Sequence, residues 1–365
     1  MTTLPNSRYQ SSASFKILAL AVSVGAIAVA ISTMMAQTNE SHPGVLTSYE
    51  RFAAHDGLML QTIITKPENI SERLPAILFV QWLSCDTVGI SSNPGDGWSA
   101  MLRRVVRESK ALVWRTEKRG VGSSQGNCAT MDYETELSDH REALARLRQR
   151  PDVDPQRVFI FGGSIGGTYA PLLAADQDLA GVIVWGAGAT TWAERTMKFE
   201  RNALELGGVE PKSLAPEMNN RFQFLNRYLI EGATPADIAA SNPLLGKVWS
   251  QMVGTAPSAH YGRPFAFHQQ AQRADWAAAW SRVKAPVLAM YGEYDWFESR
   301  DATSLIARIV NKTRPGAATF VEIPRMNHHF TLYPTAEDAF AERNGAVNPD
   351  PAVDVMLSWL LKQSK

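Results

Sequence analysis

Short apolar runs alternate with segments of helical periodicity along most of this chain. The runs are almost wholly apolar, as expected of parallel strands that are buried on both faces of a sheet. They lie at residues 75–80, 111–114, 158–161, 181–185, 286–291 and 318–323. Helical spacing is found at residues 98–109, 135–150, 304–311 and 352–362. Strands that alternate with helices predict the α/β class, with a doubly wound and mostly parallel sheet.

One stretch interrupts this alternation. After the strand predicted at 181–185, no clear buried strand occurs until residue 286. The stretch is rich in Glu, Arg, Gln, Ala and Trp, and helical patterning occurs at residues 195–206 and 219–229. We therefore expect a helical subdomain that is inserted into the sheet domain. The predicted division is a core at residues 37–190 and 285–365 and an insertion at residues 191–284.

The N-terminus has a composition of its own. Residues 1–16 are polar with a small positive charge, residues 17–31 are almost wholly apolar, and a small residue stands at Ala36. This pattern is typical of a secretory signal at residues 1–36 rather than of a buried core helix. If it is not cleaved, the segment at residues 17–36 is just long enough to anchor the chain in a membrane. Either way we expect the folded part to be exported, as a periplasmic, secreted or membrane-anchored protein.

The charge and the cysteine content of the chain argue against nucleic-acid binding and against a metal site. The chain has 365 residues, with 36 basic and 36 acidic side chains, so its formal net charge is zero. Without a basic excess, we do not expect a nucleic-acid partner. The chain has two cysteines and contains neither Cys-x-x-Cys nor His-Glu-x-x-His, so no metal site is predicted.

The stretch Gly162-Gly163-Ser164-Ile165-Gly166 lies between the buried strand at 158–161 and a helical segment. The pattern Gly-x-Ser-x-Gly in a strand–turn–helix context is typical of a nucleophile elbow, whose turn is so tight that larger side chains would collide. The helix that follows points its amide groups at the serine, which favours a developing oxyanion. A glycine-rich packing turn is the alternative. A phosphate loop is disfavoured because no lysine follows the glycines. We predict that Ser164 is a nucleophile.

A serine nucleophile needs a base, and the base needs an acid that orients it. Asp295 follows the strand predicted at 286–291, and His328 follows the strand predicted at 318–323. Because the carboxyl ends of parallel strands lie along one edge of a sheet, we expect both side chains to meet the serine there. The neighbouring His329 is the alternative base. Structural or surface roles are expected for His42, His55, His140, His260 and His268.

The chain order of serine, aspartate and histidine, together with four motifs, resembles the α/β-hydrolases. The most similar members are bacterial serine hydrolases of the esterase, lipase and serine-aminopeptidase-like groups, and the resemblance covers about residues 48–365. The resemblance implies an α/β-hydrolase fold, a catalytic triad, a helical cap formed by the insertion, and no cofactor. The motifs are Gly-Gly-Ser164-Ile-Gly-Gly, Gly292-Glu-Tyr-Asp295, Asn-His328-His-Phe330 and Arg119-Gly-Val-Gly-Ser-Ser124.

One motif departs from the family pattern. The family commonly has His-Gly after its third strand, where this chain reads Gln81-Trp82-Leu83-Ser84. The resemblance implies that the backbone amides of Leu83 and Ile165 form the oxyanion hole. Backbone donors tolerate a change of side chain. The amide of Trp82 is the alternative to that of Leu83.

The resemblance also bears on the two cysteines. Cys85 and Cys128 follow strands that are neighbours in this fold, and both loops lie at the same edge of the sheet. An even number of cysteines in an exported chain permits a disulfide. The fold therefore implies a bond between Cys85 and Cys128.

Acyl transfer is the chemistry that the resemblance implies. His328 would take the proton of Ser164, which attacks a carbonyl group while Asp295 orients the imidazole, and water would then release the acyl group. Hydrolysis of a carboxylic ester is the first hypothesis, with a small-molecule ester as substrate. A peptidase or amidase acting on a short peptide is the second. A binding protein with the hydrolase fold and an inactive site is the third.

Overall fold

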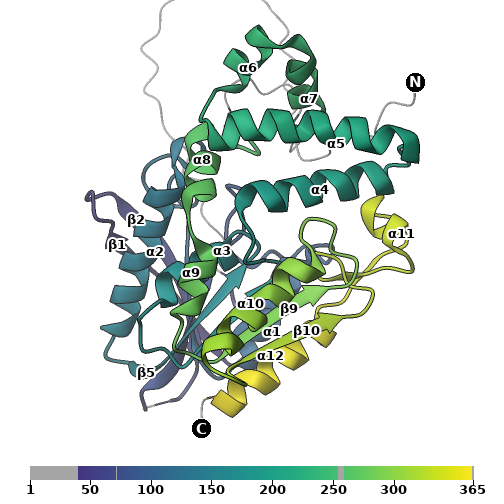
Figure 1. The fold of residues 1–365 in the computed structure, drawn as a ribbon. Coiled ribbons are helices and arrows are strands. Elements are labelled where there is room, and N and C mark those ends of the chain that lie inside the picture. The colour runs from purple at the N-terminus through teal and green to yellow at the C-terminus, as the bar shows by residue number, and fades with distance from the viewer. Residues whose placement is uncertain (1–39, 71, 254–258, 364–365) are drawn as a thin grey trace, which may run out of the picture. The chain divides into compact units, whose positions relative to one another are not determined.

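The computed structural model describes residues 40–70, 72–253 and 259–363, and an eight-stranded sheet lies at its centre (Figure 1). The strands lie in the order β1-β2-β4-β3-β5-β6-β9-β10. From β4 to β10 neighbouring strands are parallel, whereas β2 is antiparallel to both β1 and β4. The prediction of an α/β fold with a mostly parallel sheet is confirmed. The bounds are β1 (Val45–Ala53), β2 (Met59–Pro67), β3 (Leu74–Val80), β4 (Leu112–Thr116), β5 (Val153–Gly163), β6 (Gly181–Trp185), β9 (Val287–Gly292) and β10 (Ala318–Ile323).

Strands β1 and β2 were not among the strands predicted from the sequence. β1 is an edge strand that buries only Val45 and Phe52, so most of its residues are polar or partly exposed. β2 buries polar side chains, among them Thr62, whose hydroxyl donates to the carbonyl of Arg115 at 3.0 Å. A search for apolar runs misses such strands, because hydrogen-bonded polar side chains occupy part of their buried face.

Helices cover both faces of the sheet. In β3, Ala76 and Leu78 join the buried cluster on one face, and Ile77 and Phe79 join the cluster on the other. Helices α2, α3 and α10 contribute to the first cluster, and α1 and α12 contribute to the second. The sheet is therefore doubly wound. The bounds are α1 (Gly97–Glu108), α2 (Tyr133–Arg148), α3 (Gly166–Ala174), α10 (Arg300–Thr313) and α12 (Asp350–Gln363).

Helices occupy most of the chain between β6 and β9. Figure 1 shows α4 and α5 side by side above the sheet, with α6 and α7 beyond them. Helix α9 instead packs against α3 and α10 on one face of the sheet. A cap at residues 191–284 therefore stays a prediction. The bounds are α4 (Trp192–Leu206), α5 (Pro211–Leu225), η2 (Asn226–Ile230), α6 (Pro235–Ser241), α7 (Pro243–Val253), β7 (Ala259–His260), β8 (Arg263–Pro264), α8 (Phe265–Arg273) and α9 (Trp276–Ser281).

Several short elements lie outside the sheet and the long helices. The short elements are η1 (Cys128–Thr130), β11 (Thr331–Leu332), α11 (Ala336–Phe340) and β12 (Ala346–Val347). The predicted signal or anchor at residues 1–36 lies outside the described residues, and so does its apolar part at residues 17–36. Within the described ranges, none of the helices combines the length and the apolar character needed to cross a bilayer. Export and membrane attachment stay predictions.

Candidate active site

Ser164 lies in a sharp turn between β5 and α3. Its φ angle is 56°, in the left-handed region that residues other than glycine rarely adopt. A Cβ atom on Gly162 would lie 2.5 Å from the carbonyl oxygen of Gly166, and a Cβ atom on Gly166 would overlap the carbonyl of Val80. The turn therefore requires glycine on both sides of the serine, as a nucleophile elbow does.

Backbone hydrogen bonds attach this turn to the neighbouring strand and helix. The amide of Ser164 donates to the carbonyl of Trp185 at the end of β6, and its carbonyl accepts from the amide of Gly167, both at 2.8 Å. Helix α3 has no acidic residue in its first turn, so the positive end of its dipole faces the serine uncompensated. Ile165 lies at this amino end, where the amides of a helix are left without helical acceptors.

Asp295 lies in the turn after β9 and is almost fully buried. Its Oδ1 atom accepts from the amides of Phe297 at 2.9 Å and Glu298 at 3.1 Å, and its Oδ2 atom lies 2.7 Å from Nδ1 of His328. Burial by itself would raise the pKa of Asp295. The charge and hydrogen bond of His328 and the amide of Glu298 outweigh burial and lower this pKa, so the side chain is a carboxylate.

His328 follows β10 and reaches across the ends of two strands. A Cβ atom on Gly186, directly after β6, would lie 2.6 Å from Cε1 of the imidazole. The carbonyl of His328 accepts from Nε1 of Trp185 at 2.9 Å, so the indole holds the backbone as Asp295 holds the ring. With Nδ1 engaged by the carboxylate, Nε2 is the nitrogen that is left for proton transfer.

The serine and the histidine are brought to neighbouring strand ends. Gly163 of β5 pairs with Trp185 of β6, and the ring of His328 lies against Gly186. Adjacent strands are about 4.8 Å apart, so one strand spacing separates the turn of Ser164 from this ring. Among the described residues, no hydrogen bond joins Ser164 to His328. Such catalytic hydrogen bonds are often long before substrate binds.

His329 lies in a different environment. Its ring is nearly perpendicular to that of His328 at a centroid distance of 5.4 Å, and it contacts Phe297 at 5.5 Å. Burial, together with the charge of His328, lowers the pKa of His329 to about 4. Asp295 thus pairs with His328, while the imidazole of His329 is neutral at pH 7. The role of each histidine stays a prediction.

The loop between β3 and α1, residues 81–96, approaches the elbow where the sequence places the oxyanion donors. Its first residue, Gln81, lies with Val80 against the close-packed Gly166. The carbonyls of Trp82, Leu83 and Ser84 all accept hydrogen bonds from the ammonium group of Lys118. Lys118 was not among the predicted site residues, although it is a charged residue two positions after a buried strand.

A disulfide joins the β3–α1 loop to η1. Cys85 and Cys128 are bonded, with their Cα atoms 5.8 Å apart, as the sequence predicted. The bond closes a loop of 43 residues. It restrains the segment that carries the Leu83 amide.

We expect that Cys85→Ser lowers the free energy of unfolding by about 3–4 kcal/mol, because the unfolded chain regains the entropy of a long loop. Urea unfolding of the variant and of the oxidised wild-type protein would measure this difference. Unreduced wild-type protein should contain no thiol that can be alkylated, as mass spectrometry would show. Two alkylatable thiols in that sample would contradict the bond.

Aromatic side chains form one side of the site, and we name Phe199, Tyr261, Trp296 and Phe297 the aromatic wall. Phe199 of α4 stacks on Trp296 at 5.1 Å and on Phe297 at 5.6 Å. The ring of Phe297 also contacts the ring of His328, at a centroid distance of 5.1 Å. All four side chains are partly exposed. An apolar surface beside the imidazole suits an apolar part of a substrate.

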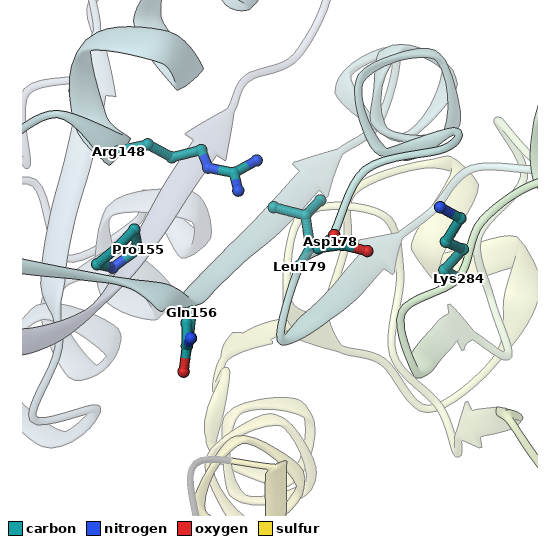
Figure 2. Close-up of a pocket in the computed structure, with 6 residues that line it drawn as sticks. All are labelled: Arg148, Pro155, Gln156, Asp178, Leu179 and Lys284. Carbon is teal, nitrogen blue, oxygen red and sulfur yellow. The ribbon is translucent and has the colours of Figure 1, made fainter.

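A cavity of about 530 Å³ lies elsewhere, at the opposite edge of the sheet. Figure 2 shows Arg148 and Lys284 on either side of it, with Leu179 between them. Its residues come from the end of α2, the start of β5 and the segments just before β6 and β9, whereas Ser164 follows the end of β5. This cavity is therefore separate from the candidate site. In the described part of the chain, no three His, Cys, Asp or Glu residues gather in a way that could hold a metal ion.

The chain is similar to known sequences at the level of a family and of a single relative. A sequence model of the alpha/beta hydrolase family matches residues 81–343. The alpha/beta hydrolase domain-containing protein WAV2 of Arabidopsis thaliana is 30% identical over 77 residues. This second match covers 21% of the chain and 24% of that relative, so it spans about a quarter of the relative's length.

Solved structures share the fold at low sequence identity. The alpha/beta hydrolase GrgF from Penicillium sp. sh18 is 14% identical with a TM-score of 0.53, over 87% of this chain and 99% of that one. Carboxyl esterase 2 from Tuber melanosporum is 14% identical with a TM-score of 0.55, over 90% and 89% of the two chains. The acylaminoacyl peptidase of Pyrococcus horikoshii is 14% identical with a TM-score of 0.50, over 82% and 40%.

Proposed function

Since this chain belongs to the alpha/beta hydrolase family, we propose that it is a serine hydrolase which cleaves carboxylic esters. The observation that carries the proposal is the 2.7 Å contact between Asp295 and His328, one strand away from the strained turn of Ser164. These three residue types, in these positions, are the parts that an acyl-transfer site needs.

The proposed reaction runs through an acyl-enzyme. Nε2 of His328 takes the proton of Ser164 as the serine oxygen attacks the ester carbonyl. The amides of Leu83 and Ile165 stabilise the oxyanion of the tetrahedral intermediate, with the amide of Trp82 as the alternative to Leu83. His328 then gives the proton to the leaving alcohol, and a water molecule repeats the sequence to release the acid. Asp295 holds the imidazole and stabilises its charged form.

The charges beside the site favour an uncharged substrate. The charge of Arg195 in α4 contributes to the lowered pKa of Asp295. Its Nε atom donates to Glu298 at 3.2 Å, and its guanidinium lies over the ring of Trp192 at 4.9 Å. Glu298, the acid that could pair with the amino terminus of a peptide, is thus already compensated by Arg195, and the aromatic wall offers an apolar surface instead. This combination supports esters of apolar acids or alcohols over peptides.

We also propose that the protein is exported. The apolar segment at residues 17–31 is typical of a secretory signal, and a disulfide is stable in oxidising compartments. A small-molecule ester outside the cytoplasm would then be the natural partner. Fractionation of producing cells, with detection of the folded part outside the cytoplasm, would test this; its recovery only in the cytoplasm would contradict it.

We expect the purified protein to hydrolyse p-nitrophenyl esters with a kcat/KM about 10- to 100-fold above that for aminoacyl p-nitroanilides. A charged amino group left without a partner loses about 1.5–3 kcal/mol of binding, which corresponds to such a factor. A fluorophosphonate probe should label one site per chain, at Ser164. Faster turnover of the anilides would make the protein a peptidase. Absence of both labelling and turnover would make it a binding protein with an inactive site.

A further inference from the structure

A buried ammonium group lies beneath the β3–α1 loop. Lys118 follows β4, its side chain is almost fully buried, and its Nζ atom donates to three successive carbonyls of that loop. The carbonyls belong to Trp82, Leu83 and Ser84, with distances of 3.0 Å to Leu83 and 2.9 Å to Ser84. Buried carbonyls need a hydrogen-bond donor, and Lys118 supplies one to all three, so it supports the path of the loop.

The direction of these carbonyls decides the direction of the amides. The peptide unit is planar and trans, so the carbonyl of Trp82 and the N–H of Leu83 point to opposite sides of the chain. Because the carbonyl of Trp82 points at Lys118, the N–H of Leu83 points away from it. The same holds for the N–H of Ser84, which shares a peptide unit with the carbonyl of Leu83. The lysine therefore sets the orientation of the proposed oxyanion donor.

A second cation reaches the same loop from the insertion. Nη1 of Arg263 in β8 donates to the carbonyl of Leu83 at 3.1 Å, and its Nη2 atom donates to the carboxylate of Glu136. A carboxylate oxygen of Glu136 also lies 3.4 Å from Nζ of Lys118, so one acid in α2 links the two cations. Burial alone would raise the pKa of Glu136, but the charges of Lys118 and Arg263 outweigh it and lower this pKa. The cluster thus keeps its carboxylate ionised.

We propose that Lys118 is a positioning residue for catalysis, whose charged ammonium group holds the β3–α1 loop so that the amide of Leu83 faces the oxyanion of the tetrahedral intermediate. The inference rests on the proposed function. Lys118 acts through the backbone and touches no substrate atom. Without the ammonium group, the carbonyls of Trp82, Leu83 and Ser84 lose their common donor, and the peptide unit before Leu83 is free to rotate.

The charge of this lysine depends on pH in an accessible range. Burial lowers the pKa of Lys118 to about 8, against the opposing effect of Glu136. The ammonium group is therefore present below about pH 8 and is lost as the pH rises through that value. Burial raises the pKa of Tyr169 well above its usual value, and that of Glu136 is lowered, so neither titrates in this range. The titratable and charged groups that act on Lys118 are Glu136 of α2, Arg263 of β8 and Asp86 of the β3–α1 loop. His140 of α2 and Tyr169 of α3 lie beside Glu136.

The first test compares Lys118→Met with Arg115→Met. Arg115 is an equally buried cation of β4 that donates to Glu40 and to the same loop at the carbonyl of Val88, but to none of the carbonyls of residues 82–84. We expect Lys118→Met to lower kcat for a p-nitrophenyl ester about 100-fold with KM within about threefold, as for a lost oxyanion donor. Arg115→Met should keep kcat within about threefold. Equal losses of kcat in the two variants would overturn the proposal, because a buried cation would then matter only for folding.

The second test uses pH to remove the charge of Lys118 in the wild-type protein. The rate of fluorophosphonate labelling at Ser164 in the wild-type protein should fall about tenfold between pH 8 and pH 10 as Lys118 loses its proton. Lys118→Arg, which keeps its charge over this range, should show no such fall. A wild-type rate that stays constant to pH 10 would overturn the proposal. If the wild-type protein is neither labelled nor active at any pH, the proposed function fails, which is a different result from a labelled protein that is insensitive to Lys118.

Discussion

Replacing Ser164 with alanine is expected to leave a folded protein and to lower ester turnover by at least about 10⁴-fold. The variant removes only the attacking oxygen. The backbone of Ser164 keeps its bonds to Trp185 and Gly167, and alanine tolerates the φ angle of 56° about as well as serine does. Turnover of a p-nitrophenyl ester, circular dichroism and fluorophosphonate labelling of the same sample would measure the effect.

Ser99→Ala is the matched control for this variant. The hydroxyl of Ser99 is also buried, but it lies in α1 and donates to Asp96 at 2.7 Å. Its loss should cost about 1 kcal/mol of stability and little activity. If Ser164→Ala keeps more than about one part in a thousand of wild-type turnover, Ser164 is not the nucleophile. A label that remains on the chain after this change would point to another serine.

The second large effect concerns the two adjacent histidines. His328→Ala should lower kcat by about 10⁴- to 10⁶-fold, because the serine hydroxyl is hardly ionised at pH 7 without a base. His329→Ala should keep at least about a tenth of the wild-type activity. The structural reason is that Asp295 lies 2.7 Å from Nδ1 of His328. The ring of His329 contacts Phe297 instead, and its plane makes an angle of 88° with that of His328.

Each histidine variant is a control for the other, because both rings lie in the same turn. Steady-state kinetics with one ester and denaturant unfolding would separate loss of activity from loss of folding. The reverse outcome, with an inactive His329→Ala and an active His328→Ala, would move the base to His329 and leave Ser164 and Asp295 in their roles. Two active variants would remove the triad and with it the proposed mechanism.

The motif around Ser164 could be read from the sequence because its constraint is local. The collision between Gly162 and Gly166 arises within five consecutive residues, and the strand before it and the helix after it are evident from their apolar patterns. Asp295 and His328 could be placed at the same edge because each follows a buried strand, and parallel strands end together. The pairing of Cys85 with Cys128 was implied by the resemblance to the α/β-hydrolases, in which the two preceding strands are neighbours, as β3 and β4 are here.

Other features gave no such signal. Strand β1 was missed because most of its residues are polar or partly exposed. Strand β2 was missed because polar side chains are buried in it, among them Thr62, whose hydroxyl donates to a carbonyl of β4. The aromatic wall combines Phe199 of α4 with Trp296, a residue 97 positions later by their numbers, which stacks on it at 5.1 Å. No periodicity or short motif records a contact of this kind.

The sequence by itself determined the class of fold, the position of the elbow and the order of the three predicted catalytic residues, since these depend on local sterics and on strands that are apolar throughout. Only the tertiary structure decided that Asp295 contacts His328 instead of His329, because ring orientation depends on Trp185 and Gly186 of another strand. It also decided that Lys118 lies beneath the β3–α1 loop. From the sequence, a lysine after a strand is expected to be a solvent-exposed charge. The burial of Lys118 is tolerated because Glu136 and three backbone carbonyls contact its ammonium group from separate parts of the chain.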